Sequence, residues 1–239
     1  MIAFGSEAKI SKERLLKSLK GHREADRITQ GTYWDDGRGC AVGCSIHDFA
    51  PGYENEYQMY EILFGIPGAL AELEDKIFED LPITAAKKWP ERFIRAIQPG
   101  ADLSRICDEW LLWLLSNDRS PLAPWQNETW MRNVARLYER RLNGDEPDFS
   151  DWRVCKERGW EICLESPGEH LAAYTAVEAA AAGLNSYMYS LPDSPAATSP
   201  RFVCYYSMKL NQEHHKYVIA DVLLGLLAAA PVKKVKNEA

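Results

Sequence analysis

Apolar residues recur at intervals of three and four positions along most of the 239-residue chain, and this spacing is typical of amphipathic helices. Leu15, Leu16 and Leu19, for example, follow Ser11, whose hydroxyl suits the start of a helix. Alternating apolar and polar residues, which would indicate strands, are sparse. The sequence therefore predicts an all-α fold, a single-domain bundle of about eight helices.

Helix ends are expected where Gly, Pro or capping residues interrupt this pattern. Asn143-Gly144 suits the end of one helix, and Ser150 suits the start of the next. Pro67 is well placed at the start of another. The expected helices include those at 12–28, 40–47, 56–64, 67–79 and 125–142.

The stretch LPDSPAATSP at 191–200 has the composition of a linker. We expect a helical core over residues 1–190, a linker-like loop at 191–200, and a C-terminal helix with a frayed tail over 201–239. The last segment is too short for an independent core, so its helix is expected to pack on the core before it.

Composition excludes several classes of protein. The net charge of −7 disfavours non-specific nucleic-acid binding, which depends on clustered Lys and Arg. The chain contains no apolar run of the roughly 18 residues that a membrane span needs. Its first residues lack the pattern of a signal peptide, so we expect a cytoplasmic protein with no membrane partner and with six reduced cysteines.

Four segments, GRGCAVGCSIHD, GIPGALAELEDKIFEDLP, WPERFIRAI and GADLS, resemble a family of uncharacterised bacterial and bacteriophage proteins, small and α-helical. The helix end from His22 to Asp26 shares this resemblance, which covers about residues 10–115. An alanine-rich segment at 171–182 and the stretch from Asp221 to Leu227 are similar more loosely. The resemblance implies an origin in a phage or mobile element and carries over no catalytic role.

The stretch GRGCAVGC at 37–44 offers two kinds of site. If 39–47 is helical, Cys40, Cys44 and His47 lie on one face and could bind zinc, with His22 as a fourth ligand and Asp26 orienting it. Alternatively, Cys40 at a helix start is a nucleophile, with His22 as its base and Asp26 as the third member.

A structural interpretation of the same stretch needs no site, and we prefer it. Gly37, Gly39 and Gly43 would let the backbone turn sharply and another segment approach closely. Cys40 and Cys44 would then be small buried residues, with His22 as a core histidine.

The segment from Glu54 to Asp80 is acidic, and Glu72, Asp75 and Glu79 fall on one helical face that we expect to be solvated. Such a face could meet a basic partner. Taken together, the sequence favours a non-enzymatic α-helical binding or interaction protein that acts on a host protein or a small ligand. The alternative is a small hydrolase or acyl-transfer enzyme that uses a Cys40 thiolate or a zinc held by Cys40, Cys44 and His47.

Overall fold

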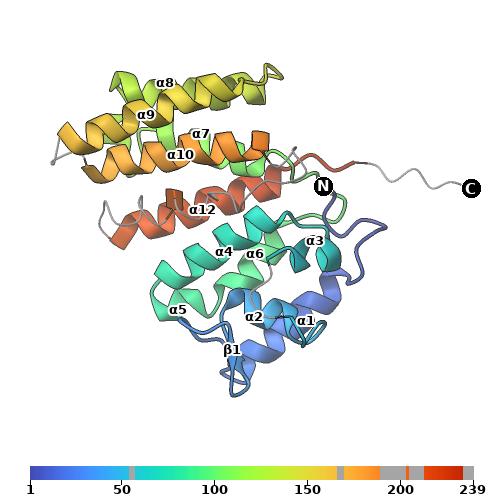
Figure 1. Cartoon of the computed structure of the whole chain (residues 1–239). Helices are drawn as coiled ribbons and strands as arrows, with labels where there is room; N and C mark the ends of the chain where they lie inside the picture. The colour runs from blue at the N-terminus through green and yellow to red at the C-terminus, as the bar shows by residue number, and fades with distance from the viewer. Residues whose placement is uncertain (54–56, 166–169, 189–202, 205–212, 234–239) are drawn as a thin grey trace, which may run out of the picture. The chain divides into compact units, whose positions relative to one another are not determined.

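A computed structural model of the chain describes residues 1–53, 57–165, 170–188, 203–204 and 213–233 (Figure 1). Eleven α-helices and one two-stranded sheet are described, which confirms the predicted all-α fold. The helices are α1 (Lys12–Glu24), α2 (Ala41–Ile46), α3 (Met59–Phe64), α4 (Gly68–Asp80), α5 (Ile83–Ala86), α6 (Trp89–Ala96), α7 (Ile106–Ser116), α8 (Thr129–Leu142), α9 (Phe149–Glu165), α10 (His170–Met188) and α12 (Glu213–Ala229). In this described part, no helix combines the length and the apolar character that crossing a bilayer requires.

Contacts group the chain into two compact units. The first unit comprises Met1–Ile106 and Ala220–Ala239, and the second comprises Cys107–Ile219. The expected linker at 191–200 and the last six residues of the expected frayed tail lie outside the described residues.

The core of the first unit forms between short helices. Its largest fully buried side chains include Leu15 and Leu19 from α1, Tyr60 and Phe64 from α3, Phe78 from α4, and Trp89 and Phe93 from α6. The buried indole of Trp89 donates a hydrogen bond from Nε1 to the Glu74 carbonyl oxygen at 3.0 Å, which fixes α6 against α4. This arrangement places the buried face of α4 against the start of α2.

Both ends of the first unit are tied to one loop. The Ala3 amide donates to the Ala101 carbonyl at 2.9 Å, and the Lys233 amide donates to the Gly100 carbonyl at 3.0 Å. Arg92 on α6 forms an ion pair with Asp221 on α12 at 2.9 Å. The first residues of the expected tail therefore pair with the body of the unit.

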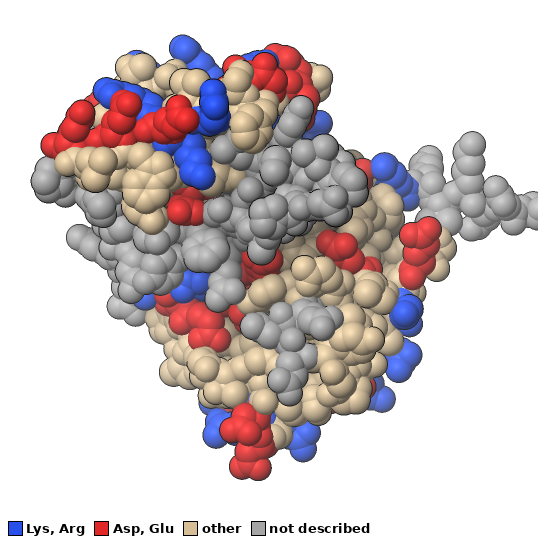
Figure 2. Space-filling model, in the orientation of Figure 1, with Lys and Arg blue, Asp and Glu red and all other residues tan. Residues whose placement is uncertain are grey.

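The second unit contains α8, α9 and α10 around aromatic side chains. The Tyr138 hydroxyl donates to the Ala179 carbonyl at 2.7 Å, and its ring meets the Trp152 ring edge-on at 5.0 Å. Arg141 lies over the Tyr138 ring and donates from Nε to Asp108 at 2.9 Å. On the face in Figure 2, acidic and basic side chains lie next to one another over α9, which also contains pairs such as Arg158 with Glu161.

Several predicted helix ends are confirmed. The Ser11 hydroxyl accepts a hydrogen bond from the Arg14 amide at 3.4 Å at the start of α1. At the end of α8, Gly144 has φ +84° directly after Asn143, as a glycine at a helix end permits. Gly65 has φ +69° and ends α3.

Other expected helix ends are wrong by two to four residues. The first helix ends at Glu24 instead of Ile28, because Asp26 adopts a positive φ of 55°. The cap of α9 is Asp148, whose Oδ1 accepts from the Asp151 amide at 3.0 Å. Ser150, the predicted cap, instead donates its own hydroxyl to Asp148. The expected helix over 125–142 begins at Thr129, after a short 3₁₀ turn at Ala123–Trp125.

Candidate functional site

The GRGCAVGC stretch forms a small hairpin strand and the start of a helix. Strands β1 (Trp34–Asp35) and β2 (Arg38–Gly39) pair antiparallel, and both turn residues, Asp36 and Gly37, have positive φ angles. Cys40 follows as the N-cap of α2, and its Sγ accepts from the Gly43 amide at 3.4 Å. The prediction that Cys40 begins a helix is therefore confirmed.

Two glycines of this stretch allow the backbone before β1 to pack onto it. A Cβ added to Gly43 would lie 1.8 Å from the Tyr33 carbonyl oxygen, and one added to Gly39 would lie 2.4 Å from the same atom. No side chain fits at such distances. The close approach expected of these glycines is thus present, and its partner is the backbone at Tyr33.

The Cys40 thiol is buried, with 4% of the residue exposed. Burial raises the pKa of this thiol well above its ordinary value, and the charge of the neighbouring Asp75, to which the thiol is hydrogen-bonded, raises it further. An activated nucleophile needs a lowered pKa. Cys40 is therefore a protonated thiol at neutral pH.

His22 and Asp26 have other partners than Cys40. His22 is buried, and its Nε2 lies 3.1 Å from Asp48 Oδ2. Burial lowers the pKa of His22, and Asp48 acts in the opposite direction. Asp26 is exposed and pairs with Lys87, and with Arg38 at 3.8 Å.

Within the described residues, no hydrogen bond or ion pair joins any two members of the predicted triad Cys40, His22 and Asp26. Asp48 stands where Asp26 was expected, beside the imidazole. The reason is local, because Asp26 has a positive φ just past the end of α1 and thereby leaves the helical face that His22 occupies. The sequence carries Asp48 directly after His47, in the same SIHD segment.

The predicted zinc ligands Cys40, Cys44, His47 and His22 also do not converge. Cys40 has an extended backbone, with ψ −176°, so its side chain does not continue the helical face of Cys44. The Cys44 thiol donates to the Gly39 carbonyl at 3.4 Å, and burial raises its pKa to about 12. The His47 ring stacks on the Trp34 ring at 4.0 Å.

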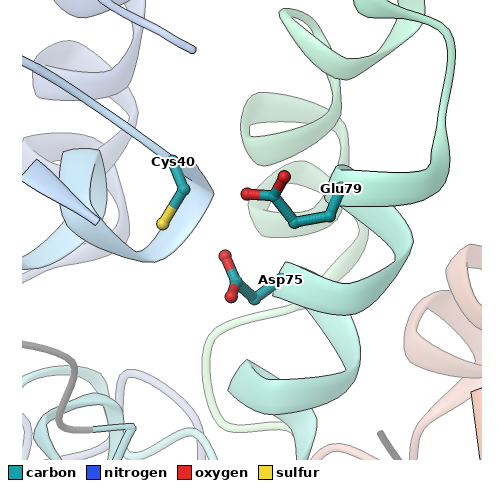
Figure 3. Close-up of side chains that lie close together, drawn as sticks. All are labelled: Cys40, Asp75 and Glu79. Carbon is teal, nitrogen blue, oxygen red and sulfur yellow. The ribbon is translucent and has the colours of Figure 1, made fainter. Parts of the chain in front are cut away.

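Cys40 instead meets two carboxylates from α4 (Figure 3). One ligand atom from each of Cys40, Asp75 and Glu79 lies within 4.8 Å of the other two, and no other such group of three occurs in the described ranges. Asp75 Oδ2 accepts from the Tyr57 hydroxyl at 3.0 Å, and Glu79 Oε2 accepts from the Gly31 amide at 2.9 Å.

The acidic face of α4 is thus not the solvated face that the sequence predicts. Asp75 is buried and Glu79 is half-buried, where burial raises its pKa. Glu74 is fully buried, accepts from the Tyr60 hydroxyl at 2.7 Å, and has a pKa raised by burial to about 8. The apolar residues around these acids were a signal that α4 is buried on more than one side.

A pocket of about 460 Å³ lies in the first unit, along α1 and the residues that follow α2. Its lining residues from α1 follow a spacing of three and four positions, which places them on one stripe of the helix. They are Arg14, Lys17, Ser18, Gly21 and His22, and they are joined by Ala25, Arg27, Asp48 and Phe49. Sequence reasoning missed this basic stripe, although its spacing is visible in the sequence.

The pocket is positively charged in an acidic protein. Arg14, Lys17 and Arg27 contribute three positive charges and Asp48 one negative charge, which leaves +2 with His22 neutral. None of these three cations is in an ion pair with any residue that the structure describes. Arg14 lies over the Phe49 ring, 5.5 Å from its centroid.

The polar groups inside the pocket are held by one another. The Ser18 hydroxyl donates to Asp48 Oδ2 at 2.5 Å, the oxygen that also faces His22. His22 Nδ1 is buried and has no hydrogen-bond partner in the described part of the chain.

Comparison of the chain with protein-family models, curated proteins and solved structures found no match.

Proposed function

We propose that the protein is a non-enzymatic binding protein whose first unit takes a small anionic ligand in the α1 pocket. The observation that carries this proposal is the set of three cations around the mouth of the pocket, none of them in an ion pair within the described residues. Guanidinium and ammonium groups are the usual partners of carboxylates and phosphates. A ligand with such a group would gain charge-assisted hydrogen bonds there.

The remaining groups of the pocket fit the rest of such a ligand. Asp48 accepts hydrogen bonds, so it suits a ligand hydroxyl or amine, and the Phe49 ring offers an apolar surface. The pocket volume of about 460 Å³ is that of a small-molecule site. The proposal therefore concerns a metabolite-sized anion with at least one polar donor.

The state of Cys40, the one nucleophile that the sequence predicts, supports a binding function over a catalytic one. Cys40 is buried, and its thiol pKa is raised by that burial. We therefore do not assign the hydrolase or acyl-transfer activity to this thiol. The phage or mobile-element origin that the resemblance implies remains part of the proposal and carries no activity with it.

Isothermal titration calorimetry with inorganic phosphate and with citrate tests the pocket directly. We expect saturable binding of at least one of them at low ionic strength, weakened by added salt because the pocket is open to solvent. A triple variant that removes the pocket cations should reduce the affinity at least tenfold; its changes are Arg14→Gln, Lys17→Gln and Arg27→Gln.

A matched variant removes three exposed cations that do not line the pocket, so it has the same net charge as the pocket variant. Its changes are Lys9→Gln, Lys20→Gln and Arg136→Gln. It should bind as the wild type does. Equal losses in the two variants would show that only the net charge matters and would contradict a site at α1. If neither phosphate nor citrate binds at millimolar concentration, the proposal is overturned.

A further inference from the structure

A thiol and two carboxylates from separate elements of the first unit converge near the start of α2 (Figure 3). Cys40 is the N-cap of α2, and Asp75 and Glu79 are four residues apart on one face of α4. Figure 3 shows both carboxylates extending from α4 toward Cys40, and the three ligand atoms lie within 4.8 Å of one another.

These separations approach those in a four-coordinate metal site. Zinc bonds sulfur at about 2.3 Å and carboxylate oxygen at about 2.0–2.2 Å, so neighbouring ligand atoms in a tetrahedral site stand roughly 3.5 Å apart. Small side-chain rotations would bring the three atoms to that spacing. Glu79 has the longest side chain of the three and is only half-buried, so it can supply most of this movement.

We propose that Cys40, Asp75 and Glu79 bind one divalent cation of the zinc type through one sulfur and two carboxylate oxygens. A sulfur ligand favours Zn²⁺ or Co²⁺ over Mg²⁺ and Ca²⁺, which prefer oxygen ligands alone. Three protein ligands leave a fourth position to solvent. The site is separate from the anion pocket, so neither proposal depends on the other.

The neighbours of the two carboxylates would orient them toward the metal. The Tyr57 hydroxyl donates to Asp75 Oδ2 at 3.0 Å, and the Gly31 amide donates to Glu79 Oε2 at 2.9 Å. Hydrogen bonds of this kind commonly hold the ligands of metal sites in place.

Binding replaces the proton of the Cys40 thiol by the metal. The S–H bond breaks, a sulfur–metal bond forms, and the proton leaves to solvent. Metal binding therefore releases one proton, so the affinity should fall as the pH is lowered.

Titration of the metal-free full-length protein with Co²⁺ tests the site, because a thiolate bound to cobalt gives a charge-transfer absorption band in the near ultraviolet. We expect the band to saturate at one Co²⁺ per chain and to be displaced by Zn²⁺. Cys40→Ser should abolish the band, and Glu79→Gln should weaken cobalt binding at least tenfold.

Cys44→Ser is the matched control, because Cys44 is equally buried, lies four residues later and does not belong to the group. It should keep the band. Glu79→Gln changes a half-buried side chain, so it tests the site even if Cys40→Ser fails to fold, and circular dichroism checks the fold of each variant.

Two outcomes would overturn the proposal. One is the lack of any thiolate band at micromolar to millimolar Co²⁺ in the folded wild type, which would leave Cys40 as a buried thiol hydrogen-bonded to Asp75. The other is a band that is lost in Cys44→Ser but unchanged in Glu79→Gln. That result would favour the set predicted from sequence, with Cys44, His47 and His22.

Discussion

Gly43 lies so close to the Tyr33 carbonyl that a Cβ on Gly43 would stand 1.8 Å from the Tyr33 oxygen. The absence of a side chain at Gly43 therefore lets the segment before β1 pack against α2. This relationship explains the third glycine of the GRGCAVGC stretch, Gly43, without reference to a ligand. It also fixes the position of Cys40, which is held between Gly39 and α2.

Replacing Gly43 by Ala should therefore destabilise the protein. Overpacking a buried position costs about 1–3 kcal/mol, and a contact this short belongs at the upper end of that range. The free energy of unfolding from urea denaturation measures the loss.

Gly225→Ala is a suitable control, because Gly225 is a helical glycine with no atom within 4 Å of an added Cβ. It should stabilise the protein by about 0.5–1 kcal/mol, since Ala loses less backbone entropy than Gly in a helix. A Gly43→Ala variant as stable as the wild type would contradict the tight packing at Tyr33.

Local signals in the sequence predicted much of the fold. Ser11, Gly65 and Gly144 mark helix ends in the structure because each acts through its own hydroxyl or its own φ angle, without help from distant residues. The Ser150 prediction failed because Asp148, two residues earlier, offers a better acceptor for the same helix start.

The site was harder to predict, because it depends on which faces of different helices meet. Cys40 was correctly placed at a helix start, but its partner on α4 lies 35 positions further along the chain, at Asp75. The acidic composition of α4 suggested a solvated face, and only packing shows that Glu74 and Asp75 are buried. The spacing of residues within one segment does not predict a contact between residues this far apart in the sequence.

Asp48, and not Asp26, should control the ionisation of His22. Burial lowers the His22 pKa and Asp48 partly opposes that effect, so Asp48→Asn should lower the pKa further. Asp26→Asn should leave it unchanged, because Asp26 pairs with Lys87 and Arg38. An NMR titration of the imidazole Hε1 resonance measures both variants. A shift caused by Asp26→Asn alone would restore the pairing predicted from sequence.

Native Cys40 and Cys44 should react slowly with iodoacetamide. Both thiols are buried and have raised pKa values, so the thiolate fraction at pH 7–8 is below that of an ordinary cysteine. Labelling followed by peptide mass spectrometry should show both sites modified only after unfolding in urea. A Cys40 thiol that titrates below about pH 7.5 would contradict this expectation and favour a nucleophile.

Glu74 should make the stability of the protein depend on pH. In the unfolded chain this carboxyl ionises near its ordinary pKa of about 4.3, whereas in the folded protein burial raises the pKa to about 8. Between these two pKa values, Glu74 holds a proton in the folded state that it has lost in the unfolded state. The contribution of Glu74 to the free energy of unfolding is therefore fully present below about pH 4 and is lost as the pH rises toward 8. Glu74→Gln should remove this dependence.

Between pH 5 and pH 8, the free energy of unfolding of the wild type should fall by about 2–4 kcal/mol more than that of Glu74→Gln. Comparing the two proteins cancels the contribution of His22, whose lowered pKa changes stability in the opposite direction. Glu24→Gln, at an exposed position of α1, should behave as the wild type does. Urea denaturation at both pH values measures the free energies of unfolding. Parallel pH profiles for the wild type and Glu74→Gln would show that Glu74 is ionised in the folded protein at pH 5 and would contradict the prediction.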